Sequence, residues 1–290
     1  MLVDGHPIDI SHRQKVLYPE AGVTKGRIIS YYKKIWPVIQ PHLADRPISM
    51  LCAPDGISHA TFYRKRVPSY FPDWISRVTI PLKKGGTQTQ VMINTKADLI
   101  YVVDQACVAL HPWLAKQHAL SCPDKLVFDL DPGEGVDTTA VVTVAKRLNA
   151  RLPVSYVMTT GGKGFHVVVP LVPTASFGAV RGYAKAIAHT LAREDPDLVT
   201  ASSARAKRTG RVFVDYLRNG YGQTSIAPYA VRLKPQAGIA TPLRWDELTS
   251  QMKPKQYTIK NILRRLSHLS DPWADIAEHA VSLETLQSSE

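Results

Sequence analysis

The sequence that decides the fold is Leu126-Val127-Phe128-Asp129-Leu130-Asp131-Pro132-Gly133, in which acidic and apolar residues alternate. Because successive side chains of a β-strand point to opposite faces, the alternation predicts a strand, and the proline and glycine predict its end. Asp129 and Asp131 then lie on one face, about 7 Å apart. Two carboxylates at this distance repel each other unless a cation lies between them. The stretch therefore predicts a divalent-metal site.

A second acidic strand is expected over 211–217, where Val212 and Val214 would face the core and Asp215 the opposite side. If the two strands are neighbours, three carboxylates converge, and their oxygens favour Mg²⁺ or Mn²⁺. Two such ions, ~3.5–4 Å apart, would activate a 3′ hydroxyl and stabilise a leaving pyrophosphate. The alternative is that these acids lie in solvated turns or form salt bridges.

A glycine-rich turn, Thr160-Gly161-Gly162-Lys163-Gly164-Phe165-His166, connects two expected strands. Glycines let the backbone approach a ligand closely and turn successive N–H groups towards a phosphate. Lys163 adds a cation and Thr160 a hydroxyl, so the turn is expected to bind phosphate. It is neither a Walker loop nor a dinucleotide fingerprint. The alternatives are a hairpin without a ligand and, for His166, an ordinary packed strand residue.

The other elements follow from apolar periodicity, caps and turn residues. Helices are expected at 24–40, 96–109, 137–149 and 177–193, and further strands at 48–53, 154–159, 165–171 and 224–232. A hairpin is expected over 76–93 with a lysine-bearing tip at 83–86, and the tail from 245 is expected to be polar and helical, anchored by Asp271-Pro272-Trp273. This mixture predicts an α/β fold with mixed sheets rather than an all-parallel one.

Composition narrows the classes of partner. The 290 residues carry 36 basic and 24 acidic side chains, a formal charge of +12, which favours a polyanion such as a nucleic acid. The alternative is a generally basic protein. Hydrophobic residues at 44% argue against disorder, and neither a signal peptide nor a membrane-spanning run is present. Cys52, Cys107 and Cys122 have no close spacing, which argues against a disulfide framework and a zinc site and fits a cytoplasmic protein.

The acidic strands and the glycine turn together, in this order and spacing, resemble the polymerase domain of bacterial DNA ligase D, a branch of the archaeo-eukaryotic primase superfamily. The resemblance covers nearly the whole chain. It implies one primase-polymerase domain over 1–290 that contains an RRM-like module and flanking helices. The N-terminal lobe (about 1–120) would bind DNA ends, the catalytic lobe would span about 121–245, and a helical tail about 246–290.

Roles in nucleotide binding are implied by the same resemblance. Asp129, Asp131 and Asp215 match the catalytic, metal-binding acids, with two Mn²⁺ or Mg²⁺ ions per site. The residues that match nucleotide-binding positions are Thr160, Gly161, Gly162, Lys163, His166, Arg208, Arg232 and His111.

The resemblance also implies DNA contacts. Lys15 and Lys25 match a pocket for a downstream 5′ phosphate, Phe62 and Tyr63 match an aromatic pair that stacks on template bases, and Lys65, Lys83 and Lys84 are further DNA-binding candidates. Surface charge is the alternative for the lysines, and core packing for the aromatic pair. The chain departs from the family pattern at His12, Cys52 and Arg64, so the 5′-phosphate and template contacts are open.

The function expected from the resemblance is template-directed nucleotidyl transfer that fills gaps and extends 3′ ends during non-homologous end joining. Its partners would be DNA ends with a 5′ phosphate, ribo- or deoxyribonucleoside triphosphates, a ligase domain or separate ligase, and a Ku-type end-binding protein, in the cytoplasm with the nucleoid. The rival hypotheses are a metal-dependent nuclease and a non-catalytic DNA-end-binding module. A ligase is disfavoured because no Lys-x-Asp-Gly motif is present.

Overall fold

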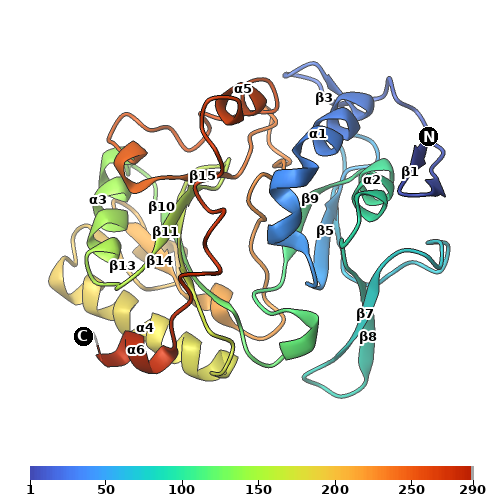
Figure 1. Ribbon diagram of the computed structural model, residues 1–290. Helices are drawn as coiled ribbons and strands as arrows, with labels where there is room; N and C mark the ends of the chain where they lie inside the picture. The colour runs from blue at the N-terminus through green and yellow to red at the C-terminus, as the bar shows by residue number, and fades with distance from the viewer. Residues whose placement is uncertain (289–290) are drawn as a thin grey trace.

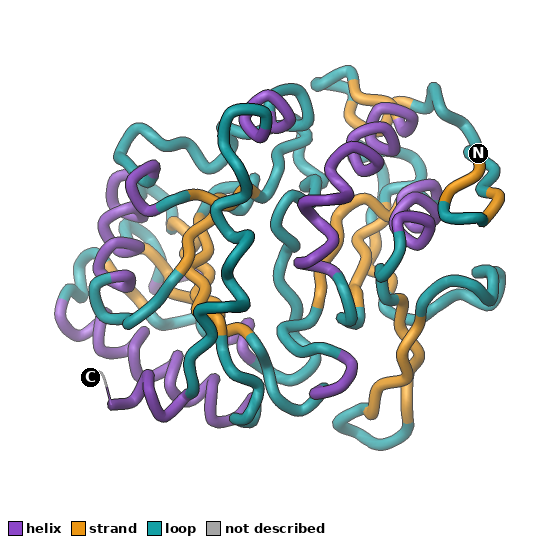
Figure 2. The backbone as a smooth tube through the Cα atoms, in the orientation of Figure 1, coloured by secondary structure: helices purple, strands orange, loops and turns teal. Residues whose placement is uncertain are grey.

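Two β-sheets face each other in the computed structural model, which describes residues 1–288. The N-terminal lobe with α1 and α2 lies on one side of the molecule, and the sheet that contains β10 lies on the other (Figure 1). Irregular segments run between the two (Figure 2). The mixed α/β fold expected from the sequence is confirmed.

The C-terminal sheet has six strands in the order β13-β14-β10-β12-β11-β15. Neighbouring strands are antiparallel except β13 and β14, which are parallel. The strands are β10 (Lys125–Pro132), β11 (Tyr156–Thr159), β12 (Phe165–Pro170), β13 (Val199–Thr200), β14 (Val212–Asp215) and β15 (Thr241–Leu243).

An RRM-like module forms the centre of this sheet, as expected. Along the chain it runs β10-α3-β11-β12-α4-β14, and in space its strands lie in the order β14-β10-β12-β11, which is the β-α-β-β-α-β arrangement. Helices α3 (Thr138–Asn149) and α4 (Phe177–Glu194) lie on one face of the sheet (Figure 1). They pack on Leu126, Phe128 and Leu130 of β10. The acidic residues of β10 are therefore left on the other face.

The N-terminal sheet has five strands, with the central β5 paired to β6, β8 and β9 and with β7 at the edge. They are β5 (Ile48–Cys52), β6 (Phe62–Arg64), β7 (Arg77–Pro81), β8 (Thr87–Val91) and β9 (Cys107–Pro112). Two short hairpins, β1 (Leu2–Val3) with β2 (His6–Pro7) and β3 (Val16–Tyr18) with β4 (Val23–Thr24), precede helix α1 (Lys25–Leu43). The core of this lobe also contains Val127, Met158 and Val168, so it joins the two sheets.

Three expected elements differ from the structure. Helix α2 (Lys96–Asp104) is shorter than expected, because Ala106 has a positive φ of 54° and the apolar run that follows is the buried strand β9. The expected strand over 224–232 is irregular, because Pro228 lacks an N–H group and Tyr229 has a φ of 63°.

The C-terminal tail is also less regular than expected. Beyond residue 244 the described chain contains α5 (Ile262–Leu266), α6 (Leu283–Ser288) and a 3-10 turn (Trp245–Glu247), and the rest is loop. Pro254 and Pro272 interrupt the helical pattern. Trp273, the expected anchor, is 2% exposed and donates its indole N–H to the Val157 carbonyl at 3.2 Å.

The expectation of no disulfide is wrong. Cys52 and Cys107 are cross-strand partners in β5 and β9 and form a disulfide, while Cys122 is free. Their separation of 55 residues gives no local signal, because only the pairing of β5 with β9 brings them together.

Within residues 1–288, every helix is too short or too polar to cross a membrane.

Candidate active site

Asp129 and Asp215 lie directly opposite each other on neighbouring antiparallel strands. Asp131 follows two residues along β10, opposite Phe213, and is therefore on the same face as Asp129. Asp129 and Asp215 are 7% and 8% exposed, so both carboxylates are largely removed from water. The strand pairing thus brings together the three acids that the sequence analysis singled out.

Asn219 fixes the turn that follows β14. It is fully buried, accepts the Val127 N–H at 2.8 Å and donates to the Val127 carbonyl at 2.8 Å. A side-chain amide here continues the pairing of β10 after strand β14 has ended. The neighbouring Arg218 is thereby held beside the acids.

Arg218 lies between the two opposed carboxylates. Its Nε donates to Asp129 Oδ2 at 3.3 Å and lies 3.5 Å from Asp215 Oδ2. His166, opposite Asp129 on β12, places Nε2 3.4 Å from Asp129 Oδ1. Burial alone would raise the pKa of Asp129, but His166 and Arg218 outweigh it and lower that pKa to about 2.

The other two acids carry charge less readily. Burial, together with the Asp129 carboxylate, raises the pKa of Asp131 to about 6. Burial also raises the pKa of Asp215, against the hydrogen bond that its carboxylate accepts from the Leu217 N–H at 2.8 Å. Negative charge is therefore crowded at this end of β10, as expected of groups that bind cations.

Metal binding would require a rearrangement of this cluster. Within residues 1–288, no three His, Cys, Asp or Glu side chains are positioned as a ready-made metal centre. The donor chemistry fits Mg²⁺ or Mn²⁺, because the oxygens of Asp129, Asp131 and Asp215 are hard ligands on one face. The Arg218 guanidinium is near two of these carboxylates, so a cation would have to replace its contacts.

The glycine turn packs closely against both neighbouring segments. Thr160 Oγ1 donates to the Gly164 carbonyl at 3.0 Å and accepts the Gly162 N–H at 3.3 Å, so the threonine holds the turn in shape. A Cβ on Gly164 would lie 2.0 Å from the Leu130 carbonyl oxygen, and Gly161 has a φ of +65°. Glycine is thus required at both positions.

Asp129, Asp131 and the turn meet at a cavity of about 420 Å³, here called the central cavity, and Asp215 is not among its lining residues. Its lining residues are Ser49, Tyr63, Lys65, His111, Asp129, Asp131, Thr160, Gly162, Lys163, His166, Arg218, Gln223, Thr224, Ser225, Ile226, Arg232 and Lys234. The cavity is thus lined by both carboxylates and cationic side chains, in a volume typical of small-molecule sites.

Two buried polar groups of the cavity lack a partner within the described chain. His111 Nε2 and Ser49 Oγ make no hydrogen bond there, although the two residues are cross-strand neighbours in β9 and β5. Burial and the nearby Arg232 lower the pKa of His111 to about 3, so its imidazole is neutral at pH 7. Because buried polar groups are normally satisfied, these two atoms are candidates to contact a polar ligand in the cavity.

The two arginines predicted from the resemblance occupy different places. Arg232 lines the central cavity, where burial lowers its pKa although Asp129 favours its charge. Arg208 does not line it. The Arg208 guanidinium lies 3.8 Å from the centre of the Phe213 ring and donates to the Ser203 carbonyl at 2.6 Å.

The aromatic candidates for DNA binding are on the surface. Phe62 is 43% and Tyr63 56% exposed, so core packing does not account for them. Tyr63 lines the central cavity and makes an edge contact with His111, with ring centres 5.6 Å apart. Lys65 is also exposed and lines the same cavity.

The lysines proposed to bind a 5′ phosphate differ in their exposure and their contacts. Lys15 is exposed and pairs with Asp55 at 2.7 Å. Lys25 is 5% exposed, pairs with Asp104 at 2.8 Å and donates to Ser11 Oγ at 2.8 Å. The Lys25 ammonium is therefore committed to internal contacts that hold the loop before α1.

Lys83 and Lys84 are exposed at the tip of the β7–β8 hairpin. The hairpin projects away from the N-terminal lobe (Figure 1). Tyr221 connects it to the catalytic lobe, since the Tyr221 hydroxyl donates to the Pro81 carbonyl at 2.9 Å and the Lys83 Nζ lies 5.9 Å from the centre of its ring.

Several cavity residues were missed by the sequence analysis, above all Arg218, Ser49 and Lys234. Arg218 had a local signal, because it follows Asp215 by three residues in the same motif. Ser49 had none, since its position depends on the pairing of β5 with β9.

The β-α-β-β-α-β sheet, with acids paired across its central strands beside a glycine turn, has the features of a nucleotidyltransferase of the primase-polymerase class. In comparisons with known proteins, residues 24–273 match the family model described as LigD, primase-polymerase domain. The chain belongs to the family of LigD primase-polymerase domains, which are nucleotidyltransferases of end joining.

Individual relatives agree. The multifunctional non-homologous end joining protein LigD of Mycolicibacterium smegmatis is 34% identical over 270 residues, covering 91% of this chain and 35% of that protein. The protein of the same name from Pseudomonas aeruginosa is 30% identical over 279 residues, covering 93% of this chain and 33% of its own length. The chain thus spans about a third of the length of these relatives.

Among solved structures, the polymerase domain of Mycobacterium tuberculosis ligase D in complex with DNA matches with a TM-score of 0.87 and 30% identity. The match covers 94% of this chain and 99% of that one.

Proposed function

We propose that this chain adds nucleotides to the 3′ ends of DNA breaks under the direction of a template and so fills gaps during non-homologous end joining. The observation that carries the proposal is the direct pairing of Asp129 with Asp215, with Asp131 on the same face, beside a cavity that Lys65, Lys163, Arg218, Arg232 and Lys234 also line.

The three carboxylates would hold the divalent ions, Mg²⁺ or Mn²⁺, two per site. Bound there, such ions lower the pKa of a 3′ hydroxyl and neutralise a triphosphate. Arg218 contacts both Asp129 and Asp215, so its guanidinium reduces the repulsion between the two carboxylates. Release of Arg218 towards the cavity would add a cation for the triphosphate.

The nucleotide would bind in the central cavity. Thr160 orients the Gly162 N–H, and Lys163, Arg232 and Lys234 supply positive charge for the phosphates. His111, neutral and without a protein partner at Nε2, would bind a polar atom of the nucleotide. Both ribo- and deoxyribonucleotides are candidate substrates.

DNA would lie across the exposed side of the N-terminal lobe. Phe62 and Tyr63 offer aromatic faces for bases, which suits any template sequence. Lys15 in the loop before α1 would bind a 5′ phosphate, while Lys25 supports that loop from within, and the hairpin lysines Lys83 and Lys84 would contact a second strand. Loop 205–208, with Arg208, would approach the primer.

The relatives' names and the DNA in the Mycobacterium tuberculosis structure support this assignment. By the same reasoning the partners would include a ligase domain or a separate ligase and a Ku-type end-binding protein, and the chain would act at the bacterial nucleoid.

The test is extension of a labelled primer in a gapped duplex with a 5′ phosphate, with Mn²⁺ and each nucleotide type. The wild-type chain should lengthen the primer. Asp129→Asn and Asp215→Asn should each reduce the rate by on the order of 10³-fold with DNA binding retained. Asp197→Asn, at an exposed acid elsewhere, is the matched control and should leave the rate unchanged.

The same assay separates the rival functions. Shortening of the DNA with Mn²⁺ alone would indicate a nuclease. Binding without any change in DNA length, unaffected by either acid substitution, would indicate a non-catalytic end-binding module.

A further inference from the structure

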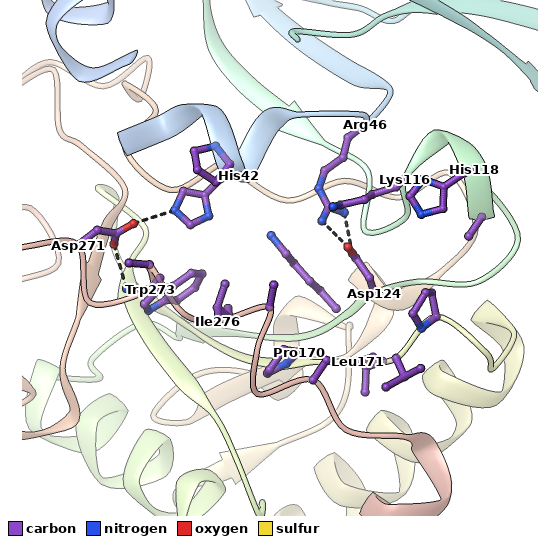
Figure 3. A pocket seen from close by; sticks show the side chains of 18 of the residues that line it. His42, Arg46, Lys116, His118, Asp124, Pro170, Leu171, Asp271, Trp273 and Ile276 are labelled. Atoms are coloured by element: carbon purple, nitrogen blue, oxygen red, sulfur yellow. Dashed lines mark hydrogen bonds and ion pairs between the residues drawn. The ribbon is translucent and has the colours of Figure 1, made fainter. Parts of the chain in front are cut away.

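A second cavity, of about 470 Å³, lies between the two lobes at the opposite end of β10 from the acids. The end of α1, the start of β10 and the C-terminal segment around Trp273 enclose it, and Figure 3 shows His42 and Arg46 on one side of it and Trp273 and Ile276 on the other. We call it the seam cavity. No described residue lines both the seam cavity and the central cavity.

The walls of the seam cavity are mainly apolar. Val38 of α1, Leu171 after β12, and Trp273 and Ile276 of the C-terminal segment are among the apolar residues that line it. In Figure 3, Trp273 and Ile276 lie next to each other, and Leu171 lies farther along the same side of the cavity, beyond Pro170. An apolar cavity of this volume with a few polar groups is the usual form of a small-molecule site.

The acids of the seam cavity already have partners. Asp124 forms a bidentate pair with Arg46, with Nη1 2.7 Å from Oδ1. Asp271 pairs with His42 at 3.1 Å and accepts the Tyr229 hydroxyl at 2.7 Å. Both interactions of the first pair, and the His42 contact, are drawn in Figure 3. Arg46 therefore neutralises Asp124, whereas Asp271 keeps its charge, because burial lowers the pKa of His42 and the Asp271 carboxylate is held by hydrogen bonds.

Lys125, the first residue of β10, also lines this cavity and has no such partner. Its ammonium makes no hydrogen bond or ion pair with another residue of 1–288; Asp124, its neighbour in sequence, is engaged by Arg46. Burial and the charges of Arg46 and Lys116 lower the pKa of Lys125 to about 7. A partly buried amine without a partner is energetically unfavourable. A ligand that carries a negative group would pair with it, and this contact would favour binding.

Lys125 is also separate from the chemistry at the acids. Lys125, Val127, Asp129 and Asp131 alternate along one face of β10, and four residues of strand place Lys125 about 13 Å from Asp129. The buried Val127 lies between them. Nucleotidyl transfer at the central cavity therefore gives no reason for a lysine here.

We propose that the seam cavity binds a small carboxylate with an apolar body. Its carboxylate pairs with the Lys125 ammonium, and its apolar part contacts Leu171, Trp273 and Ile276. A single negative charge matches the site, because three cationic side chains of the lining (Arg46, Lys116 and Lys125) face two carboxylates (Asp124 and Asp271), which leaves one positive charge in excess.

The test uses isothermal titration of the purified chain with 2-naphthoate, and with neutral 2-naphthamide of the same shape. Naphthoate should bind at one site per chain, and naphthamide about 10-fold more weakly or less. Lys125→Met should weaken naphthoate binding about 10-fold or more. Lys185→Met removes an exposed lysine on α4, on the other face of the sheet, and should leave the affinity unchanged.

A second variant closes the cavity and keeps the amine. Ala277 lines the seam cavity, so Ala277→Phe should abolish naphthoate binding with Lys125 intact. The proposal is overturned if wild-type protein does not bind naphthoate at millimolar concentration, if naphthamide binds equally well, or if Lys125→Met or Ala277→Phe binds naphthoate like the wild type. If Lys125→Met does not fold, Ala277→Phe and the naphthamide comparison decide the outcome.

Discussion

The two ends of strand β10 carry side chains of opposite charge, and the surroundings of these side chains differ. At the C-terminal end, Asp129 contacts the Arg218 guanidinium and the His166 ring in a polar cavity. At the N-terminal end, Lys125 lies in a mainly apolar cavity. The two carboxylates of this cavity contact other side chains, Asp124 with Arg46 and Asp271 with His42. The same alternation of side chains places both groups on one face of the sheet.

The two ends differ in whether the charged side chain has a partner of opposite charge within the chain. Arg218 contacts Asp129 and Asp215, and an incoming metal ion can replace it, so these two acids have a partner before substrate binds and can still bind metal. The Lys125 ammonium has no partner among the described residues, so only a ligand would supply one. Acids with a replaceable cationic partner are expected in a catalytic site, and a lysine without a partner is expected in a binding site.

Among substitutions outside the three acids, the largest effect is expected at the acidic end of β10. Gly164→Ala places a Cβ 2.0 Å from the Leu130 carbonyl oxygen, so the glycine turn or β10 must move. We expect a loss of about 1–3 kcal/mol in the free energy of unfolding and about a 100-fold fall in primer extension, because the triphosphate is displaced. Urea unfolding and the extension assay measure the two effects.

Gly182→Ala is the control for this substitution. Gly182 lies within α4, and a methyl group added at its Cα would meet no atom within 4 Å. Alanine there should therefore stabilise the chain by about 0.5–1 kcal/mol and leave extension unchanged. Equal effects at Gly164 and Gly182 would show that the close packing of the turn on Leu130 is not required.

An intermediate effect is expected from Arg218→Gln. Without the guanidinium, Asp129 and Asp215 repel each other and gain from a cation, so Mn²⁺ affinity in the absence of nucleotide should rise about 10-fold. Electron paramagnetic resonance of free Mn²⁺ measures it. Arg193→Gln, on the exposed side of α4, is the control. Unchanged or weaker Mn²⁺ binding in Arg218→Gln would contradict competition between Arg218 and metal.

The smallest effect concerns the other end of the strand. The folded pKa of Lys125, about 7, is below that of an unfolded lysine, so burial of its charge costs stability. This cost is full below pH 7 and disappears as pH rises towards the unfolded pKa of about 10.4. Lys125→Met should therefore be more stable than wild type at pH 6, by about 1 kcal/mol, and the gap should shrink by pH 9.

Urea unfolding of both proteins at the two pH values measures this gap, with Lys185→Met as the control. A gap that stays constant or widens with pH would show that the Lys125 amine is not destabilised by its surroundings.

The sequence predicted much of the acidic end and none of the lysine end. Alternation in β10 and β14 placed Asp129, Asp131 and Asp215 on the correct faces, since this depends only on the two-residue period of a strand. That the strands would be neighbours came from the resemblance to a family. Local pattern alone does not give strand order.

The features that the sequence did not predict have one cause in common. His111 was expected just after a helix but lies in β9, Cys52 and Cys107 are paired only by strand register, and Lys125 was one basic residue among 36 with no local signal. Each depends on contacts between segments distant in sequence. Pro228 and the positive φ of Tyr229 likewise broke a strand that composition alone predicted.

The most direct test of the central claim, that Asp129, Asp131 and Asp215 hold the catalytic ions, is anomalous diffraction from crystals with Mn²⁺ and a non-hydrolysable nucleoside triphosphate. We predict Mn²⁺ peaks within coordination distance of Asp129 and Asp131, one of them also bound by Asp215, with Arg218 displaced from between Asp129 and Asp215. Manganese bound elsewhere, or Arg218 still bridging these two acids with nucleotide present, would contradict the account.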